Sequence, residues 1–131
     1  MPFQKFIEIA GQAAEGIIIT TSLDRDSSSA ETKAFIKEFE KKAGHKSDMV
    51  AASAHTAVKV LVAAMRQAGS ADRAKIRDAI AATSLTAATG DISFNNLGEV
   101  RKDVQVQIVK DGNWHRHSII SDPDLLAPPN L

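Results

Sequence analysis

The run Ile17-Ile18-Ile19 constrains the fold of this chain more than any other feature of its sequence. Three consecutive β-branched residues favour a strand, and a strand that is apolar at successive positions needs cover on both of its faces. We therefore expect this strand to be buried at the centre of a sheet, with other elements packed against it.

Helical patterns surround this strand. Apolar residues at helical spacing in the first dozen positions predict a short amphipathic helix. Ser28, followed three residues later by Glu31, predicts a capping box, and Gly44 predicts a left-handed end to that helix. Asp48 is placed to cap a long helix that ends at Gly69. The alanine-rich apolar stripe of this helix predicts a central, closely packed element; it consists of Val50, Ala54, Ala57, Val58, Leu61, Met65 and Ala68.

The last part of the sequence changes its period. A third helix is expected to open at Ser70 or Asp72, after which residues 89–94 and 104–109 alternate with a period of two. Asp111-Gly112 is a strong signal for a hairpin turn. The predicted fold class is therefore α/β: a buried strand, three helices and then antiparallel strands.

The size and composition bound the possible functions. At 131 residues the chain suits one domain, which we expect over residues 1–122, followed by an extended tail over 123–131. Sixteen basic and sixteen acidic residues give no net field to attract nucleic acid or an anionic membrane. The absence of cysteine excludes disulfides and thiolate metal sites. No apolar stretch is expected to approach the ~20 residues of a membrane-spanning helix, and the first residues do not resemble a signal peptide.

His115 and His117 are the strongest candidates for metal ligands. Two positions apart on a strand, their side chains would share one face, but no acidic residue lies at ligand spacing beside them. Solvated surface histidines are the favoured interpretation, and their role stays open. We expect His45 in a loop, and His55 as a packed ring on the long helix rather than a pH switch.

The remaining polar groups do not predict catalysis. Asp24 and Asp26 are interpreted as helix-entry residues, and 95–99 as a turn rather than a calcium loop. The sequence lacks a phosphate loop, a nucleophile elbow and a zinc-protease helix motif. We therefore expect no enzyme activity and no cofactor.

The order of several short segments resembles the closing third of periplasmic binding proteins of type I, from about Phe6 to about Asp122. The nearest group comprises the leucine/isoleucine/valine-binding receptors of branched-chain amino-acid ABC transporters. Besides the two strand patterns and the isoleucine run, the resemblance lies in Asp48-Met49-Val50-Ala51-Ala52, in Lys75-Ile76-Arg77-Asp78-Ala79-Ile80 and in Gly98-Glu99-Val100.

The resemblance implies a partial type I lobe and a ligand site. Members hold an amino acid between two α/β lobes that are joined by three crossovers and close like a hinge. The family position that matches Val50 lines the pocket for the ligand's side chain and is often aromatic; Met49 is a weaker candidate. An acidic residue that holds the ligand's ammonium group lies upstream of Phe6 in the family, so the isolated chain is expected to have lost most of its affinity for amino acids.

Two hypotheses follow. In the first, the chain is an engineered, proteolysed or naturally truncated part of a periplasmic receptor that works with an ABC transporter permease. In the second, it is a self-standing interaction module. In either case a monomer would leave the isoleucine strand and the faces of Phe35, Phe39, Leu61 and Met65 in water, because the segments that cover them in the family are missing. A homodimer is expected, and exchange of the N-terminal helix and strand or of the C-terminal hairpin is one way to form it.

Overall fold

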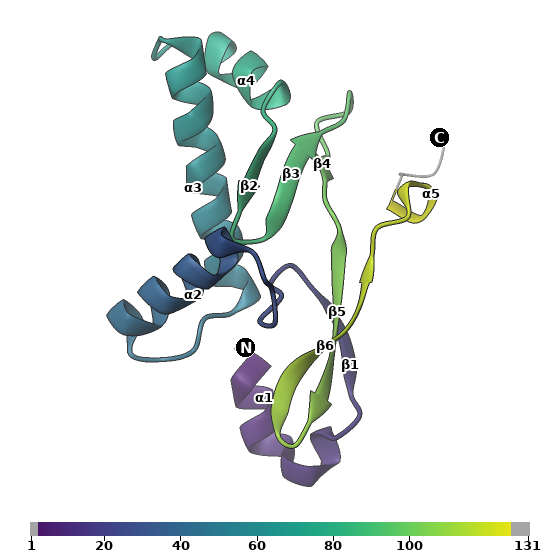
Figure 1. Ribbon diagram of the computed structural model, residues 1–131. Coiled ribbons are helices and arrows are strands. Elements are labelled where there is room, and N and C mark those ends of the chain that lie inside the picture. Colours follow the sequence, from purple (N-terminus) through teal and green to yellow (C-terminus); the bar gives the residue numbers. More distant parts are fainter. Residues whose placement is uncertain (1–2, 127–131) are drawn as a thin grey trace.

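The computed structural model describes residues 3–126, which form two groups of elements around two three-stranded sheets (Figure 1). One sheet contains the N-terminal strand and the C-terminal hairpin, and the other contains the strands between them. The elements in chain order are α1 (Phe3–Ala10), a 3₁₀ helix (Gly11–Ala14), β1 (Ile18–Thr21), α2 (Ala30–Ala43), α3 (Met49–Ala68), α4 (Arg73–Ala81), β2 (Leu85–Ala87), β3 (Gly90–Phe94), β4 (Val100–Arg101), β5 (Val104–Lys110), β6 (Asn113–Ile120) and α5 (Pro123–Leu126).

The first sheet has the strand order β1-β5-β6 and is antiparallel throughout. Asp111 and Gly112 join β5 to β6 with φ values of 51° and 69°, and two positive φ angles fit the predicted tight turn. The 3₁₀ helix and α1 close one side of this sheet. Their shared core is small and consists of Ile7, Ala14, Val109 and Trp114.

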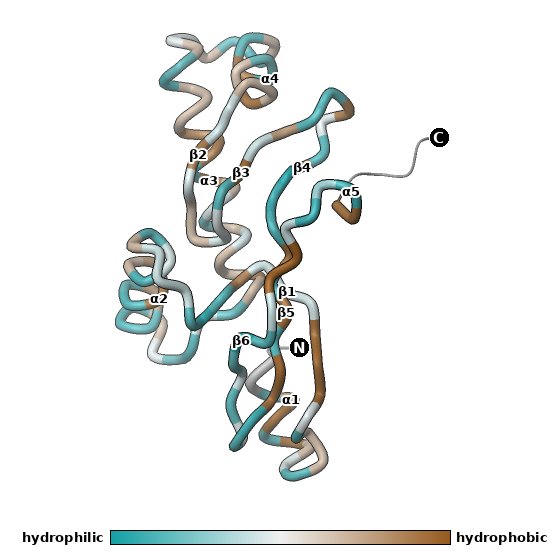
Figure 2. Tube along the Cα trace, turned by 45° about the vertical axis from the view of Figure 1, so that its right-hand side comes forward, coloured by the Kyte–Doolittle hydropathy of each residue, from teal (hydrophilic) through white to brown (hydrophobic). Residues whose placement is uncertain are grey.

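The prediction that the isoleucine strand is central and buried is wrong. Among residues 3–126, β1 is an edge strand that pairs with β5 alone, and Ile17 and Ile18 are 39% and 53% exposed. Figure 2 shows this apolar run along an outer side of the first sheet. The accompanying expectation, that the chain alone leaves this strand edge in water, is confirmed.

The second group contains the sheet β2-β3-β4 together with α3 and α4 (Figure 1). α3 packs on the sheet through a cluster of Val60, Ala87 and Ile92. A separate cluster joins α2 and the start of α3 to the chain that leaves β1; it consists of Leu23, Phe35, Ala52 and Ala88. The interior is therefore divided into small clusters rather than gathered in one large core.

The helix ends follow the local sequence signals with one exception. Gly44 and Gly69 end α2 and α3 in the left-handed conformation, and Asp48 and Asp72 cap α3 and α4 through their side chains. The predicted capping box of Ser28 is wrong. α2 begins one residue later, with Ser29 at the N-cap and without a side-chain cap.

α3 buries a different face from the one that its apolar stripe predicted. The buried residues are Ala52, Thr56, Val60 and Ala64, because small side chains at this spacing allow the strands to approach the helix closely. The predicted stripe is exposed over most of its length. We call this exposed surface the outer face of α3; it consists of Val50, Ala54, Ala57, Val58, Leu61 and Met65.

The expected uncovered apolar patch is confirmed for Leu61 and Met65, which are exposed. Phe35, in contrast, is only 6% exposed and is covered by the chain itself.

α3 is also long and apolar enough, by length and composition, to cross a membrane, so the expectation that no stretch approaches this length is wrong. A core helix passes the same test.

The accessible surface is large for the mass of the chain. It amounts to 8600 Å², whereas a compact monomer of 14.0 kDa exposes about 6,700 Å². The difference, roughly 1,900 Å², exceeds the ~800 Å² that one partner buries in a standard protein interface. The chain therefore carries surface of the extent that other parts of a protein normally cover.

The chain end departs from the predicted extended tail. Pro123–Leu126 form the short helix α5. Residues 127–131 lie outside the described residues.

Candidate functional site

Segments that cross between the two groups form the centre of the molecule. Residues 22–29 lead from β1 to α2, residues 102–103 lead from β4 to β5, and residues 121–122 lead from β6 to α5 (Figure 1). A rotation of one sheet relative to the other must pass through these segments. The contacts that they make therefore decide where the molecule can bend.

Two of the crossings are tied together at Lys102. Its Nζ donates a hydrogen bond to Ser22 Oγ, which lies 80 residues earlier in the chain. Lys102 is half-buried, and burial lowers the pKa of its ammonium group. The contact keeps the exit of β1 beside the entry to β5.

Arg116 of β6 holds the first crossing segment. Its Nε donates to Asp24 Oδ2 at 2.9 Å, and its Nη2 donates to the same carboxylate and to the backbone oxygen of Asp26 at 3.0 Å. The backbone N–H of Arg116 donates to Asp26 Oδ2 at 2.7 Å. Asp24 is only 7% exposed, and its hydrogen bond raises the pKa of the Arg116 guanidinium. The interpretation of both aspartates as helix-entry residues is therefore incomplete, because their main partner lies on a distant strand.

The start of α3 is fixed by its own cap and by Arg25. Asp48 Oδ1 accepts a hydrogen bond from the N–H of Ala51 at 2.9 Å, and the Arg25 guanidinium donates to the carbonyl oxygen of the buried Ser47. Burial lowers the pKa of Arg25, against the opposing effects of the nearby carboxylates of Glu40 and Asp48. This network holds the first turn of α3 in a defined position.

Val50 lies on that first turn and is 68% exposed, whereas Met49 beside it is half-buried. An apolar groove of about 300 Å³ lies between α3 and the strands β3 and β4, and its α3 side includes Ala57, Val60 and Leu61. Neither Val50 nor Met49 borders this groove. Val50 lies three residues before Ser53, the first α3 residue of the groove, and is open to solvent.

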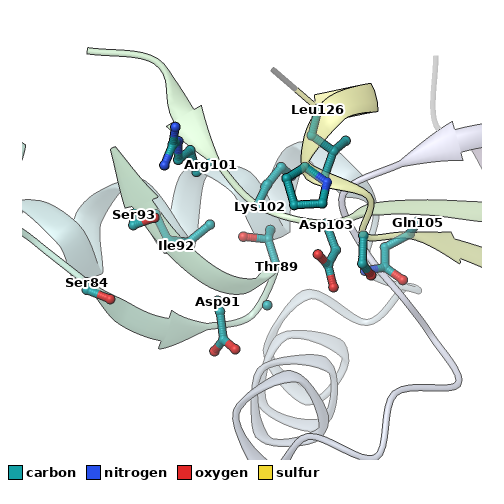
Figure 3. Close-up of a pocket in the computed structure, with 13 residues that line it drawn as sticks. Ser84, Thr89, Asp91, Ile92, Ser93, Arg101, Lys102, Asp103, Gln105 and Leu126 are labelled. Carbon is teal, nitrogen blue, oxygen red and sulfur yellow. The ribbon is translucent and has the colours of Figure 1, made fainter. Parts of the chain in front are cut away.

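A polar cavity of about 400 Å³ lies at the junction of the two groups, beside α5 (Figure 3). Asp91, Asp103 and Gln105 border it together with Lys102. The side-chain Oε1 of Gln105 is buried and has no hydrogen-bond partner. Neither Val50 nor Met49 borders this cavity.

His115 and His117 differ in their surroundings on β6. His115 lies 3.9 Å from Asp26 through Nδ1, whereas His117 occupies a β-bulge, because the register shifts between Val106 and Gln107 and leaves His117 without a partner position on β5. Within residues 3–126 no group of three or more potential metal ligands comes together.

The two other histidines lie beside aromatic rings of α2. His45 is in a loop, as predicted, with its ring 5.5 Å from that of Phe39. The ring of His55 lies 4.9 Å from that of Phe35, but the side chain is exposed, so the expected packed position is only partly correct.

Known proteins resemble this chain in sequence and fold. Residues 4–113 match the family described as periplasmic binding protein. A leucine-, isoleucine-, valine-, threonine- and alanine-binding protein of Pseudomonas aeruginosa is 30% identical over 111 residues, which are 82% of this chain and 28% of that protein.

Solved structures give the same result. A leucine-binding protein of Thermotoga maritima is 33% identical and superposes with a TM-score of 0.82 over 92% of this chain and 35% of its own. A leucine-, isoleucine-, valine-, threonine- and alanine-binding protein of Brucella ovis, in its closed conformation, is 22% identical and shares the fold with a TM-score of 0.80, over 94% of this chain and 35% of its own. The chain thus spans about a third of the length of these relatives. Because the family match covers most of its residues, the chain belongs to the periplasmic binding protein family.

Proposed function

We propose that this chain supplies part of a non-catalytic solute-binding protein of an ABC transporter for branched-chain or related apolar amino acids. The observation that carries the proposal is the joint match in sequence and fold to a leucine-binding protein, at 33% identity and a TM-score of 0.82. The two sheets joined by crossing segments suit a molecule that closes on a ligand by bending between them. Its place of work would be the periplasm, and its partner the permease of the transporter.

Val50 is proposed to contact the side chain of the ligand, with Met49 as a secondary contact. Support comes from the exposure of Val50 and from the network that fixes the first turn of α3. An apolar side chain at this position offers favourable contact to the methyl groups of leucine, isoleucine or valine. The charged groups at this turn already have partners, because Arg25 donates to the Ser47 carbonyl and Asp48 caps α3, so affinity of the isolated chain for the ammonium and carboxylate groups of an amino acid should be at best millimolar.

Saturation-transfer NMR tests this proposal. Leucine, isoleucine and valine at millimolar concentration should receive saturation from the protein through their methyl groups, whereas aspartate and lysine should not. Val50→Asp should abolish the effect. Val58→Asp is the matched control, because Val58 is a similarly exposed valine two turns further along the outer face of α3, and it should leave the effect intact. An equal loss in both variants would mean that the amino acids adhere to the apolar face in general, and the proposed site would be wrong.

Self-association is the second candidate function, favoured by the outer face of α3 and the unpaired edge of β1. Both surfaces are apolar, and an unpaired strand edge offers hydrogen-bonding groups to another strand. In the absence of other cover, a second copy of the chain is proposed to occupy them in a homodimer, and exchange of α1 and β1 or of the β5–β6 hairpin is one way to form it.

A further inference from the structure

The contact between Arg116 and the first crossing segment joins parts of the chain that are 90 residues or more apart. Arg116 holds the carboxylate of Asp24 through two nitrogens, the carbonyl of Asp26 through Nη2, and the carboxylate of Asp26 through its own backbone N–H. Asp24 Oδ1 in turn accepts a hydrogen bond from the N–H of Asp26 at 3.0 Å. Residues 24–26 are therefore fixed to β6 from side chain and backbone alike.

The bulge at His117 supports this arrangement. The neighbouring β5 residues Val106 and Gln107 pair with Ser118 and Arg116 of β6. His117 lies between these two β6 residues and is therefore the extra residue of the bulge. A bulge of this kind changes the direction in which neighbouring side chains point. It allows Arg116 to reach the crossing segment while β6 continues along β5.

The contacts change after Asp26. Ser27 donates its N–H to the carbonyl of Asp24 at 3.3 Å, and Ser29 donates its N–H to Ser27 Oγ at 3.1 Å. These are local bonds within the segment. In the described chain the backbone of residues 27–29 has no hydrogen bond to the first sheet, and Ser29, the N-cap of α2, makes no side-chain cap.

We propose that Arg116 is a positioning residue that makes residues 22–26 move as one body with the first sheet, so that bending between the two sheets is confined to Ser27–Ser29 on this crossing. The contact of Lys102 with Ser22 extends the same body to the second crossing, where the bend would lie between Arg101, the last residue of β4, and Lys102. The inference rests on the proposed function only in one respect: ligand binding is the reason why the two sheets would bend relative to each other. The clamp itself can be tested without any ligand.

Spin-label distance measurements test the clamp, and the chain has no native cysteine to interfere with labelling. Cysteines at the exposed positions of Gln67 on α3 and Lys110 on β5 report the distance between the two groups. Two further pairs report internal distances. The pair Lys42–Gln67 joins α2 to α3, and the pair Gln12–Lys110 joins the 3₁₀ helix to β5. Dilution with unlabelled chain removes distances between copies. Arg116→Ala should at least double the width of the distance distribution between groups and leave both internal distributions unchanged.

Arg101→Ala is the matched control, because the Arg101 side chain makes no hydrogen bond or ion pair within the described residues, and it should retain the native width. Arg116→Lys keeps the charge but loses the forked geometry, so an intermediate width is expected. A native width between groups in Arg116→Ala would overturn the proposal. Should that variant fail to fold, Arg116→Lys decides: a native width there would overturn it equally, whereas an intermediate width would support it.

Discussion

Leu61→Glu on the outer face of α3 should dissociate the expected dimer while each copy keeps its fold. In the isolated chain Val58, Leu61 and Met65 are 60%, 43% and 42% exposed. Burial of one whole side chain of this kind contributes about 1.5–3 kcal/mol, so covering these three would contribute roughly 2–4 kcal/mol per copy. A two-fold dimer gains this contribution twice.

Leu61→Glu removes part of this gain in both copies and adds a charge that must lose its water. We expect a loss of about 3 kcal/mol of association free energy, which raises the dimer dissociation constant roughly hundredfold. Sedimentation velocity over a concentration series measures this constant. The free energy of unfolding of the single chain should fall by about 1–2 kcal/mol, because Leu61 is 43% exposed and the rest of its side chain loses apolar contact.

Val60→Ala is the control, because Val60 is the next residue on α3 but is only 7% exposed. It should lower the free energy of unfolding by about 2 kcal/mol and leave the dissociation constant unchanged. The reasoning is refuted if the native chain sediments as a 14 kDa monomer at tens of micromolar, or if Leu61→Glu leaves association unchanged and Val60→Ala weakens it instead.

Three further predictions concern the fold. Leu23→Ala empties a buried position between α2 and α3 and should lower the free energy of unfolding by about 2–5 kcal/mol in denaturant titration, whereas a change below 1 kcal/mol would contradict the packing described. Asp48→Ala should cost about 1 kcal/mol, with Asp48→Asn close to native, because only a capping acceptor is needed. The pKa of Glu31 is lowered by its hydrogen bond to Lys59, so this contribution is present above the unfolded-state pKa and is lost as the pH falls through the folded-state pKa. Carboxyl NMR titration of Lys59→Ala should show the Glu31 pKa rising toward its ordinary value; an unchanged pKa would rule out the pair.

The local signals in the sequence predicted most of the elements because they act over a few residues. Asp48, Gly44 and Gly69 limit their helices wherever the remainder of the chain lies, and Asp111-Gly112 forms a tight turn for the same reason. Ser28 failed as a cap because Ser29 occupies the N-cap of α2. A shift of one residue is enough to remove a cap.

The faces of β1 and α3 could not be predicted in the same way. α3 has two stripes that can be buried, and the stripe with larger side chains, including Leu61 and Met65, is the more apolar one. Periodicity identifies this stripe but does not say whether the same chain covers it. The small stripe around Thr56 and Val60 packs on the sheet instead.

The contact of Arg116 with Asp24 was missed because no local pattern encodes it. The two residues are 92 positions apart, and the bulge at His117 breaks the alternation that would place side chains along β6. The only signal in the sequence was the pair Asp24 and Asp26 shortly after the isoleucine strand, where a carboxylate that loses water needs a cationic partner. Which of the sixteen basic residues supplies it depends on the fold.

Titration of the isotope-labelled chain with isoleucine, followed through the backbone amide signals, tests the central claim most directly. The account predicts progressive shifts at Met49, Val50 and Ala51, with a dissociation constant in the millimolar range and little change elsewhere. The claim is contradicted if the largest shifts occur away from the first turn of α3, if no signal shifts at tens of millimolar isoleucine, or if the constant is micromolar, because the described residues would then form a complete site by themselves.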